Sequence, residues 1–256
     1  MSESILVTEK IGTTLLLKLN RPQKRNAVND DLILAIEKAI DEREPEIKVI
    51  IIHAEGGHFS AGLDLSELKE RNSKEGLEHS RMWHGVMDKI QFGAIPVIAV
   101  LKGACVGGGL EIATASHIRI AEESAFYALP EGMRGIFVGG GGSLRIPKLI
   151  GTAAMTDMML TGRVLNADEG YQKGLTQYLV ENGKGLKKAM EMAERMAQNA
   201  EMTTYAVLQV LPKIQEASHQ EASMMESLTA ALAQDSPEAK KRLRDFLEGK
   251  AKKVGE

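Results

Sequence analysis

Cysteine is almost missing from this 256-residue chain, where Cys105 is the single one. One thiol cannot form an internal disulfide, which excludes a disulfide-stapled extracellular scaffold and favours a reducing compartment. The chain also lacks any apolar run near the ~20 residues that a membrane-spanning helix needs. Its first residues, MSESILVTEK, show no basic segment followed by an apolar one, so we expect no secretory signal. These absences predict a cytoplasmic protein that does not enter a membrane.

An excess of positive charge is missing as well. The chain has 32 Lys and Arg and 35 Asp and Glu, a formal net charge of −3, so its overall charge does not favour the binding of nucleic acid. The six histidines show neither H-x-E nor H-E-x-x-H spacing, and we expect no metal site. A dinucleotide-binding G-x-G-x-x-G near the start and a hydrolase G-x-S-x-G are also lacking. The remaining composition, 43% hydrophobic and 26% charged, is typical of a globular protein.

Short strands alternating with helices are expected up to about residue 182. The apolar runs predict strands at 5–9, 13–19, 48–54, 96–101, 117–121 and 125–129. Helices are expected from a cap at Asn29 or Asp30 to about Arg43, at 75–91, and directly after Gly107–Gly109. A unit of strands followed by a helix thus recurs about four times. This pattern favours an α/β fold with stacked, turn-like layers over a plain doubly wound sheet.

From about residue 183 the character of the chain changes. Glycine becomes scarce, and Met, Ala, Glu and Lys recur at helical spacing, as in GLKKAMEMAERMAQ (185–198). We expect three helices in 185–250. The sequence therefore predicts a core over 1–182 and a helical subdomain over 183–256, packed on the core or on another subunit.

The stretch CVGGGLEIATASH (105–117) is the first candidate for chemistry. Glycine permits close backbone approach, and the start of a helix presents unpaired N–H donors. Gly107–Gly109 would then form an anion or oxyanion site beside Glu111. The alternative is a tight strand-to-helix connection in which the glycines only permit packing.

Two further segments follow apolar strands. In HFSAGLDL (58–65) a glycine-permitted turn could aim one N–H outward, and Asp64 is expected to support the loop rather than to act chemically. In FYALPEGMRGIFVGGGGS (126–143), Glu131 stands among apolar residues that would raise its pKa and make it an acid near neutral pH. The alternative for Glu131 is a solvent-facing turn. The run Gly139–Gly142 could open another helix that faces the same cavity.

Taken jointly, these segments resemble the crotonase (enoyl-CoA hydratase/isomerase) superfamily over nearly the whole chain. The resemblance rests on LNRPQKRNAV (19–28), HFSAGLDL (58–65), KGACVGGGLEIATASHIRIA (102–121), LPEGMRGIFVGGGG (129–142) and FLEGK (246–250). It implies a spiral of ββα repeats with a C-terminal helical subdomain, and a homotrimer or a hexamer made of two trimers.

The resemblance also implies an active site. The backbone N–H groups of Leu63 and Gly108 would form the oxyanion hole for a thioester carbonyl. Hydratases of the family carry two glutamates twenty residues apart, and 131 − 111 = 20 here, with Glu at both positions. Glu111 would hold and deprotonate the water, and Glu131 would protonate the α-carbon. Keeping both favours an enoyl-CoA hydratase, a hydro-lyase that converts a 2-enoyl-CoA to a 3-hydroxyacyl-CoA.

Binding of the acyl-CoA substrate is implied in the same way. The resemblance assigns it to Lys24, Arg25, Ala61, Asp64, Phe246 and Lys250, the last two in many relatives reaching CoA from a neighbouring subunit. Coenzyme A enters as part of the substrate, so no separate cofactor is expected. Val138-Gly139 replaces the usual Pro-Gly, and MRGIF (133–137) is atypical. The segment is most similar to a subgroup that includes hydratases of short or sulfur-bearing acryloyl-CoA thioesters, such as methylthioacryloyl-CoA.

Other functions stay open at this point. A 3,2-enoyl-CoA isomerase needs only the proline-linked Glu131, and other acyl-CoA lyases of the family replace one or both glutamates. A binding protein on a crotonase scaffold, including an RNA-binding one, is disfavoured by the net charge of −3 and by the lack of a basic, aromatic-rich stripe.

Overall fold

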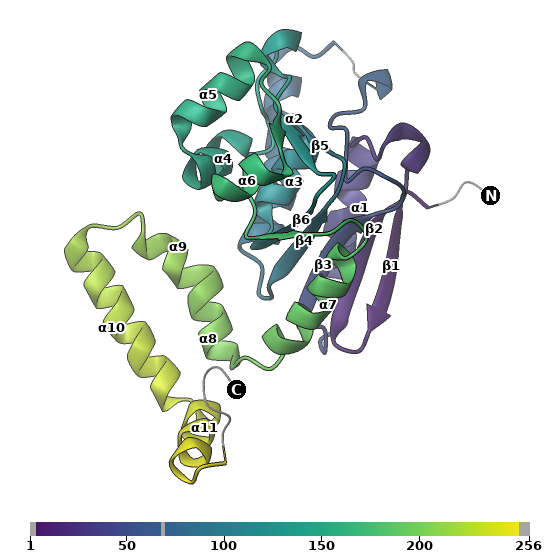
Figure 1. The fold of residues 1–256 in the computed structure, drawn as a ribbon. Helices are drawn as coiled ribbons and strands as arrows, with labels where there is room; N and C mark the ends of the chain where they lie inside the picture. The colour runs from purple at the N-terminus through teal and green to yellow at the C-terminus, as the bar shows by residue number, and fades with distance from the viewer. Residues whose placement is uncertain (1–3, 68–69, 251–256) are drawn as a thin grey trace. The chain divides into compact units, whose positions relative to one another are not determined.

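A six-stranded sheet runs through the first part of the chain in the computed structural model, which describes residues 4–67 and 70–250 (Figure 1). Its order is β1 (Leu6–Ile11), β2 (Thr14–Leu19), β3 (Val49–Ala54), β4 (Val97–Leu101), β6 (Ile118–Glu122) and β9 (Tyr178–Val180). The first two strands form an antiparallel hairpin around Gly12, and each later strand joins its neighbour in parallel. Five of these strands and β7 (Phe126–Ala128) of a smaller sheet confirm the six predicted strands, apart from small shifts at their ends, whereas β9 was not predicted.

A second, smaller layer lies beside the first. It contains β5 (Ala104–Val106), β7 (Phe126–Ala128) and β8 (Leu165–Asn166). Two isolated parallel bridges, Val28 with Leu63 and Ser60 with Cys105, extend it. After each of β2, β3, β4 and β6 the chain therefore passes through this small layer before its next helix. This repeated path produces the stacked layers that the sequence predicts, although β5 was not expected as a separate strand.

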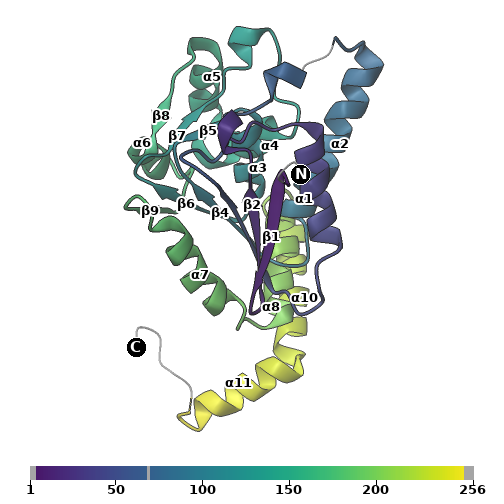
Figure 2. The ribbon, with the colours of Figure 1, turned by 90° about the vertical axis from the view of Figure 1, so that its right-hand side faces the viewer.

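Helices cover both faces of the large sheet. The helices of this part are α1 (Asp30–Asp41), α2 (Ser73–Gln91), α3 (Gly108–Ala115), α4 (Gly142–Ile150), α5 (Thr152–Thr161), α6 (Ala167–Gln172) and α7 (Gly185–Met196). Along β3, Ile50 and Ile52 enter the main core, whereas Val49 and Ile51 pack in a second cluster with α7. Burial on both faces explains why this strand is a continuous apolar run. Figure 2 shows α7 on one side of the sheet and α1 and α2 on the other.

The described residues divide into two compact units, with the division between Ala197 and Gln198. The sequence placed a boundary near 182, but α7 packs its Ala189, Met192 and Ala193 on the sheet, so the break between units follows that helix. The second unit contains α8 (Glu201–Tyr205), a π-helical turn (Ala206–Val210), α9 (Leu211–Ile214), α10 (His219–Asp235) and α11 (Pro237–Leu247). Pro212 has no N–H to continue the helical ladder, which accounts for the irregular turn before it. Three helices were expected over 185–250, where the structure has α7 followed by these shorter and longer helices of the second unit.

Candidate active site

A cavity of about 430 Å³ lies between α2, the start of α3 and the segment 131–140. It brings together four of the predicted residues, Leu63, Gly108, Glu111 and Glu131, with Trp83 of α2 beside them. Another cavity, of about 470 Å³, lies between the β1–β2 hairpin and α1 and contains none of these residues. The first cavity is therefore the candidate active site.

The N–H of Leu63 is directed by the small layer. Val28 donates to the carbonyl of Gly62 at 2.7 Å and accepts from the N–H of Asp64 at 2.8 Å. In this parallel bridge Val28 bonds to Gly62 and Asp64, the residues on either side of Leu63. The N–H of Leu63 itself therefore points away from Val28. A Cβ placed on Gly108 would lie 3.9 Å from the Leu63 nitrogen. The Leu63 donor and Gly108 thus face each other across a short gap.

Each glycine of the triplet has its own close neighbour. A Cβ on Gly107 would lie 2.4 Å from Oε1 of Glu131, and one on Gly109 would lie 2.5 Å from the Cβ of Ser60. At Gly108 the neighbour is the ring of Trp83, at 3.0 Å. Gly108 is also the first residue of α3, where an N–H has no partner within the helix. The triplet therefore permits close packing, and Gly108 places one N–H of α3 without a partner inside the helix.

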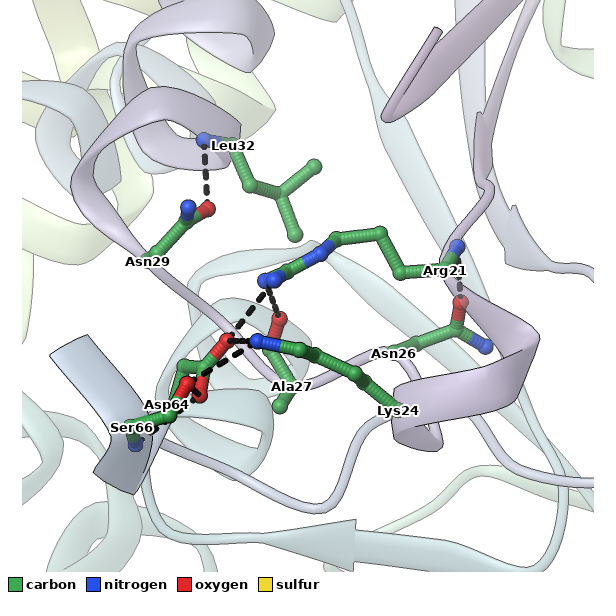
Figure 3. A network of polar contacts seen from close by, with 8 residues as sticks. All are labelled: Arg21, Lys24, Asn26, Ala27, Asn29, Leu32, Asp64 and Ser66. Atoms are coloured by element: carbon green, nitrogen blue, oxygen red, sulfur yellow. Dashed lines mark hydrogen bonds and ion pairs between the residues drawn. The ribbon is translucent and has the colours of Figure 1, made fainter. Parts of the chain in front are cut away.

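A buried ion pair fixes the loop that carries Leu63 (Figure 3). One oxygen of Asp64 accepts from Arg21 Nη2 at 2.7 Å and from Lys24 Nζ at 2.9 Å. The other accepts from the backbone N–H of Ser66 and from its hydroxyl. Burial alone would raise the pKa of Asp64, but the hydrogen bonds from Ser66, Lys24 and Arg21 outweigh it and hold that pKa well below its ordinary value. Asp64 thus has the loop-supporting environment expected from its sequence context.

The remaining residues assigned to CoA binding are spread over both units. Arg25 is exposed, has a left-handed backbone (φ 51°) and accepts from the Ala61 N–H at 2.9 Å. Phe246 is 60% exposed, and Lys250 pairs with Glu248. Phe246 and Lys250 belong to the second unit, whereas the cavity belongs to the first.

Glu111 is buried in the first turn of α3, with 4% of its surface exposed. Its Oε1 accepts from the backbone N–H groups of Gly140 and Gly142, each at 2.8 Å. Burial raises the pKa of Glu111, while these two amides and the nearby His84 and Arg145 act in the opposite direction without cancelling it. The predicted helix after the glycine run is confirmed as α4, and its start supplies the Gly142 amide.

Glu131 has a different environment. It is also buried, which excludes the alternative of a solvent-facing turn. Among the described residues its Oε2 has no hydrogen-bond partner. Burial is the main cause that raises the pKa of Glu131, and the negative charge of Glu111 raises it further. Burial thus raises the pKa of both carboxyl groups, and they differ in their contacts: Oε1 of Glu111 is held by two amides, whereas Oε2 of Glu131 has no partner in the described part of the chain.

Sequence reasoning missed three residues at this site. Trp83, the single tryptophan, donates from Nε1 to Asp30 at 3.0 Å, which holds its ring against Gly108. Its position on the apolar face of α2 was the one feature of the sequence that could have indicated a role for Trp83 at the site. Arg21 and Arg145 are buried through partners that lie far away in sequence, so no local pattern could have indicated them. Within 4–67 and 70–250, no group of three His, Cys, Asp or Glu side chains is placed to hold a metal ion. No helix there is both long and apolar enough to cross a bilayer.

Comparison with known proteins identifies the family of this chain. The sequence model of the enoyl-CoA hydratase/isomerase family matches residues 9–254. The short-chain-enoyl-CoA hydratase of Clostridium acetobutylicum is 33% identical over 76% of this chain and 76% of its own length. The crotonyl-CoA hydratase of Syntrophomonas wolfei is 31% identical over 79% of each chain. The crystal structure of a protein from Rhodopseudomonas palustris, described as a proposed enoyl-CoA hydratase, superposes on this chain with a TM-score of 0.94. The two are 58% identical, and the match covers 96% of this chain and 95% of that one.

Proposed function

The chain belongs to the enoyl-CoA hydratase/isomerase family, and from this premise we propose how its cavity hydrates a 2-enoyl-CoA thioester. The predicted crotonase-like fold is confirmed by the structural match, and the hydratases among its relatives identify it as an enoyl-CoA hydratase, a hydro-lyase. The observation that carries the proposed mechanism is the meeting of two buried glutamates and two backbone donors at one cavity.

The thioester carbonyl lies between the N–H groups of Leu63 and Gly108. Negative charge develops on this oxygen as water adds to the β-carbon, and fixed donors stabilise it without reorganising. One donor of this kind is worth about 3–4 kcal/mol in the transition state. The outward-facing Leu63 amide and the unpaired amide at the start of α3 support this placement.

The two glutamates divide the proton transfers according to their surroundings. Glu111, held by the Gly140 and Gly142 amides, is the base that takes a proton from water as its oxygen bonds to the β-carbon. Glu131, without a partner on Oε2, is the acid that protonates the α-carbon. One turnover leaves Glu111 protonated and Glu131 ionised, and transfer of a proton from Glu111 to Glu131 restores the resting pair. Because the two carboxyl groups titrate as a coupled pair, we assign the base and the acid from the contacts of each glutamate and give neither a separate pKa.

The test is to measure hydration by Glu111→Gln and Glu131→Gln on a four-carbon and a longer 2-enoyl-CoA. Each should lose about 10²- to 10⁴-fold in turnover. The double variant should be little worse than the worse single one, because the two act as a unit. A 3,2-enoyl-CoA isomerase would instead lose its reaction with Glu131→Gln and keep it with Glu111→Gln. If Glu111→Gln, folded by circular dichroism, hydrates every thioester as fast as the wild type, the mechanism is wrong.

We propose that coenzyme A lies along the exposed loop that follows Pro22, near Lys24 and Arg25, and that Ala61 and Asp64 belong to the same binding region. We propose a short 2-enoyl group as the acyl part, in line with the names of the Clostridium and Syntrophomonas relatives. Methylthioacryloyl-CoA is the narrower proposal. Steady-state kinetics from acryloyl-CoA to decenoyl-CoA, with the methylthio compound included, tests both, and a preference for the longest chains would overturn them.

Assembly into a trimer or a pair of trimers is proposed for the second unit. Helix α10 exposes Met224, Leu228 and Leu232, by 66%, 60% and 62%, and this spacing of four places them on one face. A further copy of the chain would cover such a face, and Phe246 and Lys250 would then reach a neighbour's CoA. Light scattering that gives a monomer at micromolar concentration contradicts this, as does a chain truncated before Phe246 that binds substrate normally.

The setting of the reaction is also a proposal. We place the enzyme in the cytoplasm, with no cofactor beyond the CoA of its substrate and with no nucleic-acid partner. Turnover should survive dialysis against a chelator, and the protein should pass a nucleic-acid column at low salt. Loss of activity that added metal restores would contradict the first expectation, and retention on the column would contradict the second.

A further inference from the structure

Arg145 of α4 is a buried cation that the proposed mechanism does not use, with 5% of its surface exposed. Its guanidinium donates to Asp88 at 2.6 Å and to the side chain of Gln91 at 2.5 Å, both near the end of α2. Its Nη1 donates to the carbonyl of Gly140 at 3.1 Å. Arg145 therefore ties the glycine segment 139–142 to α2.

This segment is held from two sides. On one side the amides of Gly140 and Gly142 donate to Oε1 of Glu111. On the other side the guanidinium lies so close that a Cβ on Gly141 would be 2.0 Å from Nη1 of Arg145. Gly141 also has a φ of 96°, which side chains rarely adopt. The backbone between Gly140 and Gly142 thus fills the space between the cation and the catalytic carboxylate.

We propose that Arg145 is a positioning residue for hydration, which keeps the Gly140 and Gly142 amides on one oxygen of Glu111 and leaves the other oxygen for water. The proposal rests on the role of Glu111 given above. A bidentate or forked contact of this kind requires arginine, because lysine offers a single ammonium group in place of a planar set of donors.

Loss of Arg145 has a predictable sign. The titratable and charged side chains around Glu111 are those of His84 from α2, Arg145 from α4 and Glu131 from the segment after β7. The amide bonds and the positive charge of Arg145 both favour the ionised form of Glu111. A neutral residue at 145 removes the charge and loosens the amides, so the pKa of the base rises. The acidic limb of the kcat profile should therefore move to higher pH.

The experiment compares Arg145→Met and Arg145→Lys with wild type in kcat and KM from pH 5 to pH 9, on a short 2-enoyl-CoA. For Arg145→Met we expect the acidic limb to move up by about one pH unit, which corresponds to roughly tenfold lower turnover on that limb. KM should change much less. Arg145→Lys keeps the charge and should lower kcat with a smaller movement of the limb, which keeps the test open if Arg145→Met does not fold.

Arg119→Met is the matched control. Arg119 is equally buried, with 3% of its surface exposed, and donates to the backbone carbonyls of Leu175 and Ser116, away from the cavity. Its loss should lower stability without moving the limb. An unmoved limb in both Arg145 variants, or an equal movement in Arg119→Met, overturns the proposal. If Glu111→Gln is inactive while the Arg145 limb stays in place, only this inference fails and the proposed function stands.

Discussion

Two glycine segments, Gly107–Gly109 and Gly139–Gly142, open helices beside the same cavity and use their glycines differently. In the first, a Cβ at any of the three positions would come too close to Glu131, Trp83 or Ser60. The amide at the start of α3 has no partner within the helix. In the second, two amides already bond to Glu111. A helix start attracts negative charge in both cases. In the second segment that charge is the carboxylate of Glu111, and in the first we propose that it is the thioester oxygen of the substrate.

The largest effect is expected at the loop opposite the first segment, where an ion pair holds Leu63 in place. Asp64→Asn removes the carboxylate from a buried pair in which the Arg21 side chain is 9% exposed, and breaking such a pair costs about 3–5 kcal/mol. The pKa of Asp64 is lowered in the folded state, so this stabilisation is present above about pH 4 and is lost as the pH falls through the lower folded value. Urea unfolding at pH 7 and at acidic pH should show a deficit that shrinks in acid.

Lys24→Gln is the control for that comparison. Lys24 contacts the same carboxylate but is 42% exposed, so its removal should cost at most about 1 kcal/mol. Equal unfolding free energies for Asp64→Asn and Lys24→Gln would show that the buried pair does not hold the loop.

Gly108→Ala comes next and tests the first segment directly. The added methyl group would lie 3.0 Å from the Trp83 ring and close to the space between the two donors. Alanine keeps the N–H, but a methyl group here would displace the carbonyl oxygen from the donors, and we expect kcat to fall by about 10²- to 10³-fold, as when one donor is lost. Circular dichroism should show a retained fold. A folded variant with full turnover would remove Gly108 from the oxyanion hole.

Gly142→Ala tests the second segment and should have a smaller effect on turnover. Its Cβ would lie 3.0 Å from Oε1 of Glu111, so the carboxylate must shift and one amide bond weakens. We expect a loss of about tenfold, below the range for removing a general base. The two segments differ in one further readout. The weakened amide bond raises the pKa of Glu111 and moves the acidic limb of kcat upward, whereas Gly108→Ala leaves that limb in place. Equal behaviour of both variants would end the distinction between the segments.

Gly85→Ala should have the smallest effect and provides the baseline. Gly85 is exposed in the interior of α2, and none of the described residues would lie within 4 Å of its Cβ. Replacing such a glycine should raise the unfolding free energy by up to about 1 kcal/mol and leave turnover unchanged. A rise in the melting temperature with unaltered kinetics confirms that the losses elsewhere come from contacts and not from the substitution of glycine itself.

Local patterns predicted the strands, the capped helix after Asn29 and the helix that follows Gly139–Gly142, because apolar spacing and capping residues act within a few positions. The same patterns left the triplet open between packing and amide presentation. The structure shows the close packing, because the neighbours of the glycines, Ser60 and Trp83, come from other turns of the spiral, while the presentation of an amide to a substrate stays a prediction. The end of the first unit was also beyond local reading, since only packing on the sheet reveals that α7 belongs there.

The sequence by itself determined the kind of fold, the family resemblance and the pair Glu111 and Glu131, because these depend on residue types at fixed spacings. Only the tertiary structure decided how the two glutamates differ. Glu111 meets amides 29 and 31 residues further along the chain, while the neighbours of Glu131 leave one of its oxygens without a partner. Arg21 and Asp64 are likewise 43 residues apart. Contacts of this range arise when the stacked strands bring separate turns together, and no spacing within one segment encodes them.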